Sequence, residues 1–276
     1  MSHKSGFVNI IGSPNVGKST LMNQLVGEKL SIITSKAQTT RHRILGIVND
    51  DDYQVVFSDT PGVLNPHYKL HVILFVTDIY ETNLNHEQTL LRLQKTSTPI
   101  LLLINKIDLS DQEKMEEKIA YWHEIMPNAE ILPISALQKF NIDLIWKRIV
   151  ELIPESPAYY DKDSLTDRPL KFFISEMIRE KIFIHYKKEI PYATQVDVEE
   201  YKEDEKIVRI RAIIYVERKT QKGIIIGHQG EKIKRVGIDA RKDIQKFIDK
   251  HVHLELFVKV DKDWREDDKK LEGYGY

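Results

Sequence analysis

Apolar residues in the first half of the chain fall into short continuous runs separated by polar stretches. Val72–Val76, Ile100–Ile104 and Ile131–Ile134 are such runs, and Phe7–Ile11 is a similar strand-like run interrupted by Asn9. Apolar runs of this length are typical of strands that are buried on both faces, as in a parallel sheet. A helix is predicted to open at Thr20–Leu25, after the first run. This alternation predicts an α/β domain with a mixed, mostly parallel sheet.

The second half of the chain has a different order of elements. Helical periodicity covers Leu170–Tyr186, and two strand-like runs follow around the charged turn Lys202–Lys206. A short helix, a long helix and a last strand complete the pattern. The strands are predicted at Thr194–Glu199, Ile207–Glu217 and His253–Val260. The short helix is predicted before Ile224–Ile226 and the long helix at Glu231–Lys250. The order helix, strand, strand, helix, helix, strand predicts a separate α+β module.

A polar stretch with several prolines separates the two halves. Pro154, Pro157 and Pro169 lie in it. Such a composition is typical of an interdomain linker. We therefore predict a first domain at residues 1–155, a linker at 156–169, a second domain at 170–262 and a C-terminal tail at 263–276.

Composition excludes several classes of protein. Among the 276 residues, the longest apolar runs are strand-length and far shorter than a membrane span. The polar start Met1–Ser5 is not typical of a signal peptide, and the absence of cysteine excludes disulfides. The net charge of −1 conceals a basic second half, with 21 Lys and Arg against 15 Asp and Glu in residues 168–260. We therefore expect a cytoplasmic protein whose second module is positively charged.

The first apolar run leads into a glycine-rich loop, which reads Gly-Ser-Pro-Asn-Val-Gly-Lys-Ser at residues 12–19. Glycines let backbone N–H groups point at phosphate oxygens, and the N-terminus of the following helix adds a partial positive charge. Lys18 would reach the β- and γ-phosphates, and the Ser19 hydroxyl would bind Mg²⁺. The alternative is a turn that binds no nucleotide. The candidate contacts are Gly12, Ser13, Pro14, Asn15, Val16, Gly17, Lys18, Ser19 and Thr20.

Two later segments predict recognition of the base. Asn105-Lys106-Ile107-Asp108 follows a buried run, and Ser135-Ala136 follows the next one. A carboxylate only accepts hydrogen bonds, so Asp108 would pair with the adjacent N1–H and 2-amino donors of guanine, which adenine does not offer. Ser135 and Ala136 would bring a backbone N–H near the guanine O6, and Lys106 would lie along the base. The alternative for Asp108 is a turn or helix-cap aspartate.

A third motif follows another strand-like run and has an unusual neighbour. It reads Asp59-Thr60-Pro61-Gly62, and the next residue is Val63. Ras-like enzymes carry at that position a glutamine that orients the attacking water, whereas valine neither donates nor accepts. Another group must therefore assist hydrolysis. The candidate contacts of this segment are Asp59, Thr60, Pro61, Gly62 and Val63.

A polar stretch before the strand Ile44–Val48 supplies the last candidates, Gln38, Thr39 and Thr40. One threonine hydroxyl could complete the Mg²⁺ shell when the γ-phosphate is present, and we expect this to be Thr40. All these motifs occur in a fixed order on one chain. They predict an enzyme that binds GTP and hydrolyses it to GDP and phosphate, with Asn15, Lys18, Thr40 and Gly62 as the candidate catalytic residues.

The second module contains a Gly-x-x-Gly turn between its two predicted later helices, at Gly227–Gly230. A turn of this kind is weak evidence by itself, and a plain helix–helix turn is the alternative. Between paired helices that lie on a sheet, however, it is how KH domains clamp about four single-stranded nucleotides. Basic residues surround it and favour RNA binding. The candidate RNA contacts are Lys222, Ile226, Gly227, His228, Gln229, Gly230, Lys232, Lys234 and Arg235.

Over nearly its whole length the chain resembles the Era family of bacterial GTPases. The residues that carry the resemblance are Gly12–Ser19, Ala37–Arg43, Asp59–Gly62, Ile225–Gly227 and Val260–Arg265. The resemblance implies a P-loop, Ras-like G domain followed by a type II KH domain. It also implies binding to the 3′ end of small-subunit (16S) ribosomal RNA, a role in 30S subunit biogenesis, and some peripheral membrane association. We expect a monomer, and the alternative is a regulatory G protein whose second module binds a protein.

The resemblance implies a bound K⁺ ion and shows that this sequence is short of one helix. In related potassium-activated GTPases an asparagine of the phosphate loop helps to hold K⁺, and Asn15 matches it; the alternative role is that of a turn residue. Only Ser58–His71 separate two predicted parallel strands, so the helix that the family has after Leu70 is missing. We hypothesise that a segment of switch II is omitted from this sequence at Leu70–His71; the alternative is that the protein lacks this segment.

Overall fold

The computed structural model describes residues 3–33, 44–59, 69–81, 87–262 and 264. The chain divides between Asp167 and Arg168 into two compact units. Each unit has its own sheet and its own core.

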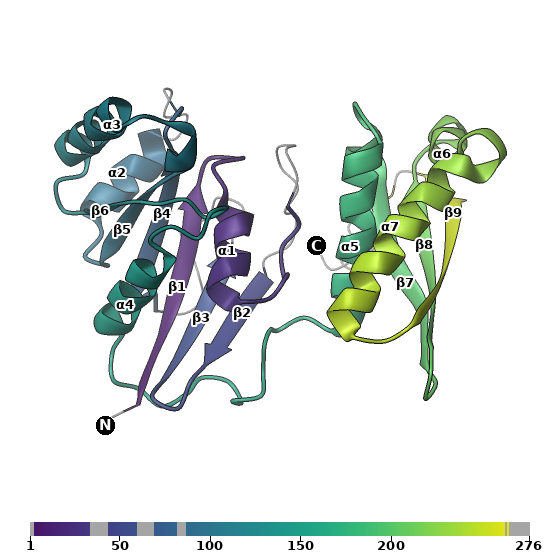
Figure 1. Cartoon of the computed structure of the whole chain (residues 1–276), viewed down its shortest axis with the longest axis horizontal. Coiled ribbons are helices and arrows are strands. Elements are labelled where there is room, and N and C mark those ends of the chain that lie inside the picture. The colour runs from purple at the N-terminus through teal and green to yellow at the C-terminus, as the bar shows by residue number, and fades with distance from the viewer. Residues whose placement is uncertain (1–2, 34–43, 60–68, 82–86, 263, 265–276) are drawn as a thin grey trace. The chain divides into compact units, whose positions relative to one another are not determined.

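The first unit contains a mixed, mostly parallel sheet, as the apolar runs predict (Figure 1). The strand order is β2-β3-β1-β4-β5-β6; β2 pairs with β3 in the antiparallel direction, and the other described neighbours pair in parallel. The described elements are β1 (Lys4–Gly12), α1 (Lys18–Val26), β2 (Ile44–Asn49), β3 (Tyr53–Asp59), β4 (Val72–Asp78), α2 (Glu87–Lys95), β5 (Ile100–Asn105), the 3₁₀ turn η1 (Ile107–Leu109), α3 (Gln112–Ile125), β6 (Glu130–Pro133) and α4 (Ile142–Leu152).

Helices cover both faces of this sheet, which explains why its central strands are apolar along most of their length. Every residue of β4 and β5 is buried. On one face, Trp122 of α3 packs edge-on against Phe75 of β4. On the other, Trp146 of α4 packs edge-on against Phe57 of β3. Gly12 at the end of β1, Asp78 at the end of β4 and Asn105 at the end of β5 lie at the carboxyl edge of the sheet, where ligands bind in open α/β folds.

The predicted linker lies along the outer strands of this sheet. The Oε1 atom of the fully buried Gln54 accepts hydrogen bonds from the backbone N–H groups of Tyr159 (2.7 Å) and Tyr160 (3.0 Å). Further along, the N–H of Ile47 donates to the carbonyl of Leu165 at 2.8 Å. The linker therefore packs on the first unit as far as Asp167, the last residue before the division.

The short connection between β3 and β4 ends beside this linker. Its residues 60–68 lie outside the described part of the chain, whereas His71 is described. The backbone N–H of Phe7 donates to Nδ1 of His71 at 3.0 Å, and the rings of Phe7 and Tyr159 pack 4.8 Å apart. Burial and the charge of Lys69 lower the pKa of His71, which keeps Nδ1 free to accept. The linker thus covers a sheet face beside this short connection.

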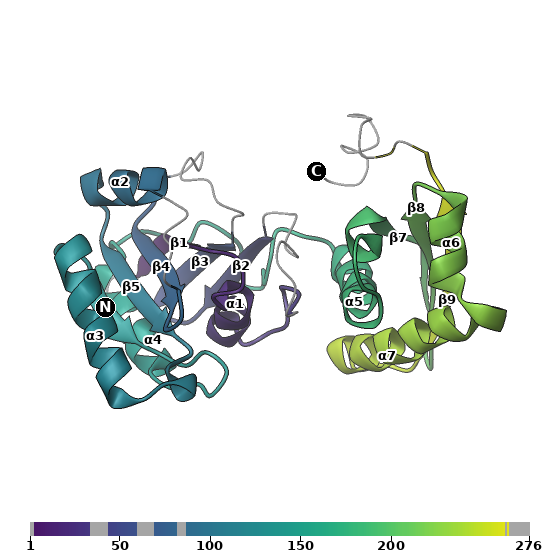
Figure 2. The ribbon, with the colours of Figure 1, turned by 90° about the horizontal axis from the view of Figure 1, so that it is seen from above.

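The second unit confirms the predicted order of six main elements. Its three-stranded sheet has the order β7-β8-β9, with β7 antiparallel and β9 parallel to β8. The helices α5, α6 and α7 pack on one face of it (Figure 2). The elements are α5 (Leu170–His185), η2 (Ile190–Ala193), β7 (Thr194–Glu203), β8 (Val208–Val216), α6 (Lys219–Ile226), η3 (His228–Gly230), α7 (Glu231–Ile248) and β9 (Val252–Val260).

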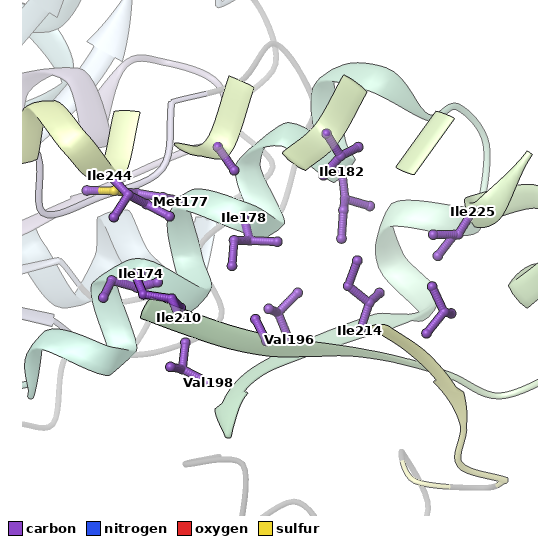
Figure 3. Close-up of a cluster of buried hydrophobic side chains, with 14 of the residues drawn as sticks. Ile174, Met177, Ile178, Ile182, Val196, Val198, Ile210, Ile214, Ile225 and Ile244 are labelled. Carbon is purple, nitrogen blue, oxygen red and sulfur yellow. The ribbon is translucent and has the colours of Figure 1, made fainter. Parts of the chain in front are cut away.

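One apolar core joins these helices to the sheet. Figure 3 shows Ile178 of α5 pointing toward Val196 and Ile214 of the strands. Alternate residues of β8 are buried in this core, while Arg209 and Arg211 between them are exposed. No helix in the described ranges of the chain is long and apolar enough to cross a membrane.

Candidate nucleotide site and nucleic-acid interface

The loop between β1 and α1 has a backbone that only certain residues can adopt. Gly12, Asn15 and Gly17 have φ values of 150°, 66° and 102°. A Cβ at Gly12 would lie 2.0 Å from the carbonyl oxygen of Val76, and one at Gly17 would lie 2.2 Å from Nδ2 of Asn105. Both glycines are therefore required, because a side chain at either would strain the backbone and collide with the neighbouring strand.

The charged groups of this loop suit a phosphate. Nζ of Lys18 donates to the carbonyls of Gly12 (2.9 Å) and Ser13 (2.7 Å), so the ammonium group lies over the loop. Gly17 is the N-cap of α1 and has no side chain that could satisfy the first N–H groups of the helix. These N–H groups and the ammonium group can bind an anion, as the sequence predicts, and Ser19 follows in the first turn.

Asn105 connects the phosphate loop to the base-reading segments. Its buried amide donates from Nδ2 to the carbonyl of Val16 at 2.8 Å. Its Oδ1 accepts from the N–H of Ala136 at 3.0 Å. Asn105 thus holds the motif after β5, the loop after β1 and the segment after β6 together, although they are far apart in the sequence. This cross-link positions the candidate site at the carboxyl edge of the sheet.

Asp108 and Lys106 are held by side chains from neighbouring loops. The hydroxyl of Ser135 donates to Oδ1 of Asp108 at 2.5 Å, and the carboxylate remains exposed to a ligand. Nζ of Lys106 lies 2.7 Å from Oδ2 of Asp78, at the end of β4. The observed partner of Asp108 is therefore a side chain of the other predicted base-reading segment.

Part of the predicted site lies outside the described residues. This applies to Gln38, Thr39 and Thr40 and to Thr60, Pro61, Gly62 and Val63. Asp59 ends β3, and its backbone lies opposite Ile10 of β1. The third motif therefore begins at the same edge of the sheet as the phosphate loop.

Sequence reasoning missed two acidic residues of this site, Asp78 and Glu81. Asp78 lies opposite Asn105 in the β4–β5 pairing and binds Lys106. Glu81 follows three residues later, and its carboxylate accepts a hydrogen bond from the hydroxyl of Ser13. Asp78 is the last residue of the buried strand β4 and Glu81 follows it closely, at the same edge as the motifs, and this position was the available signal.

The Gly-x-x-Gly turn joins α6 to α7 through the single 3₁₀ turn η3. Gly227, Gln229 and Gly230 all have positive φ, at 72°, 48° and 80°. The side chains of His228 and Gln229 are exposed at its tip. Below it, the hydroxyl of the buried Tyr186 donates to the carbonyl of Ile225 at 2.6 Å, and burial raises the pKa of Tyr186 to about 12. The loop is thus anchored from beneath while its tip stays open.

Basic residues lie on α6 and α7, the two helices that flank this loop. Lys232, Lys234 and Arg235 are exposed in the first turns of α7, and Lys222 on α6 is half-buried. Ile226 ends α6 and is also half-buried. The helix termini therefore bring together the loop and the basic residues that the sequence predicts for RNA contact.

Comparison with known proteins agrees with both halves of this description. Residues 7–125 match the family described as 50S ribosome-binding GTPase, and residues 189–265 match the KH domain. The GTPase Era of Alkaliphilus metalliredigens is 42% identical, covering 100% of both chains, and that of Staphylococcus epidermidis is 44% identical, covering 95% of this chain and 94% of its own. The chain belongs to the Era family of GTPases. It is therefore an enzyme that hydrolyses GTP.

Solved Era structures confirm the predicted fold class of a Ras-like G domain followed by a KH domain. A crystal structure of Era in complex with MgGDPNP and nucleotides 1506–1542 of 16S ribosomal RNA matches with a TM-score of 0.90 at 35% identity. A structure of Aquifex aeolicus Era bound to GDP and AlF4⁻ matches equally well, and each match covers 99% of both chains. The comparison with the Alkaliphilus Era extends over 294 residues, 18 more than the 276 of this chain. That difference agrees with the short β3–β4 connection, and the omitted segment stays a hypothesis.

Proposed function

We propose that this Era-family GTPase is a nucleotide-dependent switch that binds the 3′ region of 16S ribosomal RNA and acts in 30S subunit biogenesis in the cytoplasm. The observation that carries the proposal is the anchored Gly227–Gly230 loop, open at its tip and followed by exposed basic residues. The complex of a structurally similar Era with 16S ribosomal RNA supports the choice of RNA. A second module that binds only protein would not need this loop geometry.

In this proposal GTP or GDP occupies the edge of the sheet described above. The phosphates lie on residues 12–20 beside Lys18, and Asp108 pairs with guanine next to the Ser135-Ala136 segment, whose Ala136 N–H donates to Asn105. Mg²⁺ binds Ser19 and, in the GTP state, Thr40. Support comes from the ammonium group of Lys18, which already lies over the loop, and from the MgGDPNP in a similar Era. Bound Mg²⁺ would neutralise the charge that develops on the phosphates during hydrolysis.

The RNA proposal is tested by the dependence of affinity on salt. If Lys222, Lys232, Lys234 and Arg235 each neutralise a phosphate, log K for a single-stranded 16S 3′ fragment should fall with log[salt] with a slope of about −3. Fluorescence anisotropy with the full-length protein at several KCl concentrations measures this slope. A slope near zero, or no binding at low salt, would contradict the proposal and favour a protein partner.

We further propose that Asn15 helps to hold K⁺ and so replaces the missing catalytic glutamine at Val63. GTP hydrolysis should then be several-fold faster in potassium than in sodium, because a cation at this position stabilises the transferring phosphoryl group. Asn15 has a φ of 66°, which costs alanine about 1 kcal/mol. Asn15→Gly is therefore the sharper variant, since it removes the amide and keeps the backbone.

Steady-state rates in KCl and NaCl, together with the Kd for GDP, check this prediction. Asn15→Gly should abolish the difference between the two salts while GDP affinity changes less than about threefold. Equal rates in both salts for the unmodified protein would leave Asn15 as a turn residue.

We also propose that the protein acts as a monomer and contacts the inner face of the membrane peripherally. The excess of Lys and Arg in residues 168–260 supports the membrane contact.

A further inference from the structure

Glu81 lies where the strand β4 meets the phosphate loop, and its backbone is held on both sides. Its N–H donates to the carbonyl of Asp78 at 3.2 Å. Its own carbonyl accepts a hydrogen bond from Nζ of Lys118 on α3. Glu81 is thus fixed relative to the sheet and to one of the helices that cover it.

The carboxylate of Glu81 bridges a rigid residue and a loop residue. Oε2 accepts from the hydroxyl of Thr77 at 2.7 Å, and Thr77 is fully buried within β4. Oε1 accepts from the hydroxyl of Ser13, the second residue of the phosphate loop. Ser13 and Glu81 are 68 residues apart in the sequence, so this contact is a cross-link between two elements of the nucleotide site.

We propose that Glu81 is a positioning residue for GTP binding, which holds the first part of the phosphate loop in its binding conformation. Asn15 in the loop has a φ of 66°, a conformation that is unfavourable for a residue with a side chain, so contacts from outside the loop help to keep this shape. Asn105 supplies such a contact at Val16. Glu81 supplies a further contact at Ser13 and acts on the loop through this hydrogen bond.

Two physical effects of this carboxylate oppose each other, and they can be separated. Its negative charge close to the phosphates weakens nucleotide binding by repulsion. Its hydrogen bond with Ser13 strengthens binding, because a loop that is already ordered loses less entropy when the nucleotide binds. Glutamine in its place keeps both hydroxyl contacts, because Ser and Thr hydroxyls can donate or accept. Glu81→Gln therefore removes the charge alone, and Glu81→Ala removes the charge and the hold.

The test is a double-mutant cycle on nucleotide binding and hydrolysis in the full-length protein. Glu81→Ala should weaken GTP and GDP binding about tenfold and raise KM by the same factor, with kcat within twofold, because the hold acts before the chemical step. Ser13→Ala removes the hold but keeps the charge, so it should weaken binding at least as much as Glu81→Ala, and the double variant should bind no more weakly than Ser13→Ala alone. Glu81→Gln should bind both nucleotides at least as tightly as the unmodified protein.

Three outcomes would overturn the proposal. Effects of Glu81→Ala and Ser13→Ala that simply multiply would mean that the two residues act independently. A loss of affinity in Glu81→Gln equal to that in Glu81→Ala would assign the effect to charge. Unchanged nucleotide affinity in Ser13→Ala would show that the contact does not position the loop, and this outcome holds even if Glu81→Ala fails to fold.

Discussion

Asp108→Asn is expected to weaken the binding of GTP and to strengthen the binding of xanthosine triphosphate. The substitution replaces one carboxylate oxygen by an amide donor that faces the donors of guanine. Losing a charge-assisted hydrogen bond and leaving a donor unpaired costs about 3 kcal/mol, or about 100-fold in affinity. Xanthine carries an oxygen in place of the 2-amino group, so the new amide N–H can donate to it. Competition binding with the two triphosphates measures the change in preference.

Ser135→Ala is the matched control for this prediction. It removes the hydroxyl that donates to Oδ1 of Asp108 but leaves both acceptors of the carboxylate in place. It should weaken both GTP and GDP modestly without favouring xanthosine triphosphate, because orientation and not the donor pattern has changed. An Asp108→Asn protein that binds GTP with unchanged affinity would remove the assignment of Asp108 to the base.

Replacement of His228 and Gln229 by aspartates is expected to reduce RNA affinity at least about 100-fold. Both side chains are exposed at the tip of the loop, where a phosphodiester backbone must approach closely. Gln229 has a φ of 48°, a conformation that aspartate tolerates better than most residues, and both glycines are kept. Folding should therefore survive. Anisotropy with a single-stranded 16S 3′ fragment at moderate salt measures the loss, and basal GTP hydrolysis should change little.

A charge-matched variant tests whether the loop itself is responsible. His251→Asp combined with His253→Asp makes the same substitution of neutral by acidic side chains at exposed positions. These positions lie beyond the far end of α7, whose 18 residues span about 27 Å, several times the screening length at physiological salt. This variant should keep most of its RNA affinity. Equal losses in both variants would mean that net charge, and not the Gly227–Gly230 clamp, controls binding.

The order of elements and the positions of the motifs could be read from the sequence because they depend on local chemistry. Largely apolar runs predict the buried strands β1, β4 and β5, since strands covered on both faces are apolar along most of their length. Gly12, Gly17, Gly227 and Gly230 marked backbone turns that the structure has at positive φ. The glycines, strand ends and helix starts of a nucleotide site lie close together in the sequence, and a short motif describes them.

The sequence located the linker, but it did not predict how the linker packs on the first unit. Prolines and polar residues predict a connection at residues 156–169, and the division of the chain after Asp167 falls within it. That Tyr159 and Tyr160 hydrogen-bond to Gln54 could not be predicted, because a lone polar residue in a strand gives no sign of its partner. Gln54 is fully buried, and its amide needs those backbone groups as partners.

The sequence by itself therefore determined a GTP-binding α/β domain, a module with a Gly-x-x-Gly loop, and the residues of each motif. Only the tertiary structure decided which motifs are cross-linked, through Asn105 to Val16 and Ala136, and that Asp78 and Glu81 belong to the site at all. Such contacts depend on which strands are neighbours in the sheet and in what register. These are set by the packing of the whole domain, and residues 68 positions apart, such as Ser13 and Glu81, carry no local pattern that connects them.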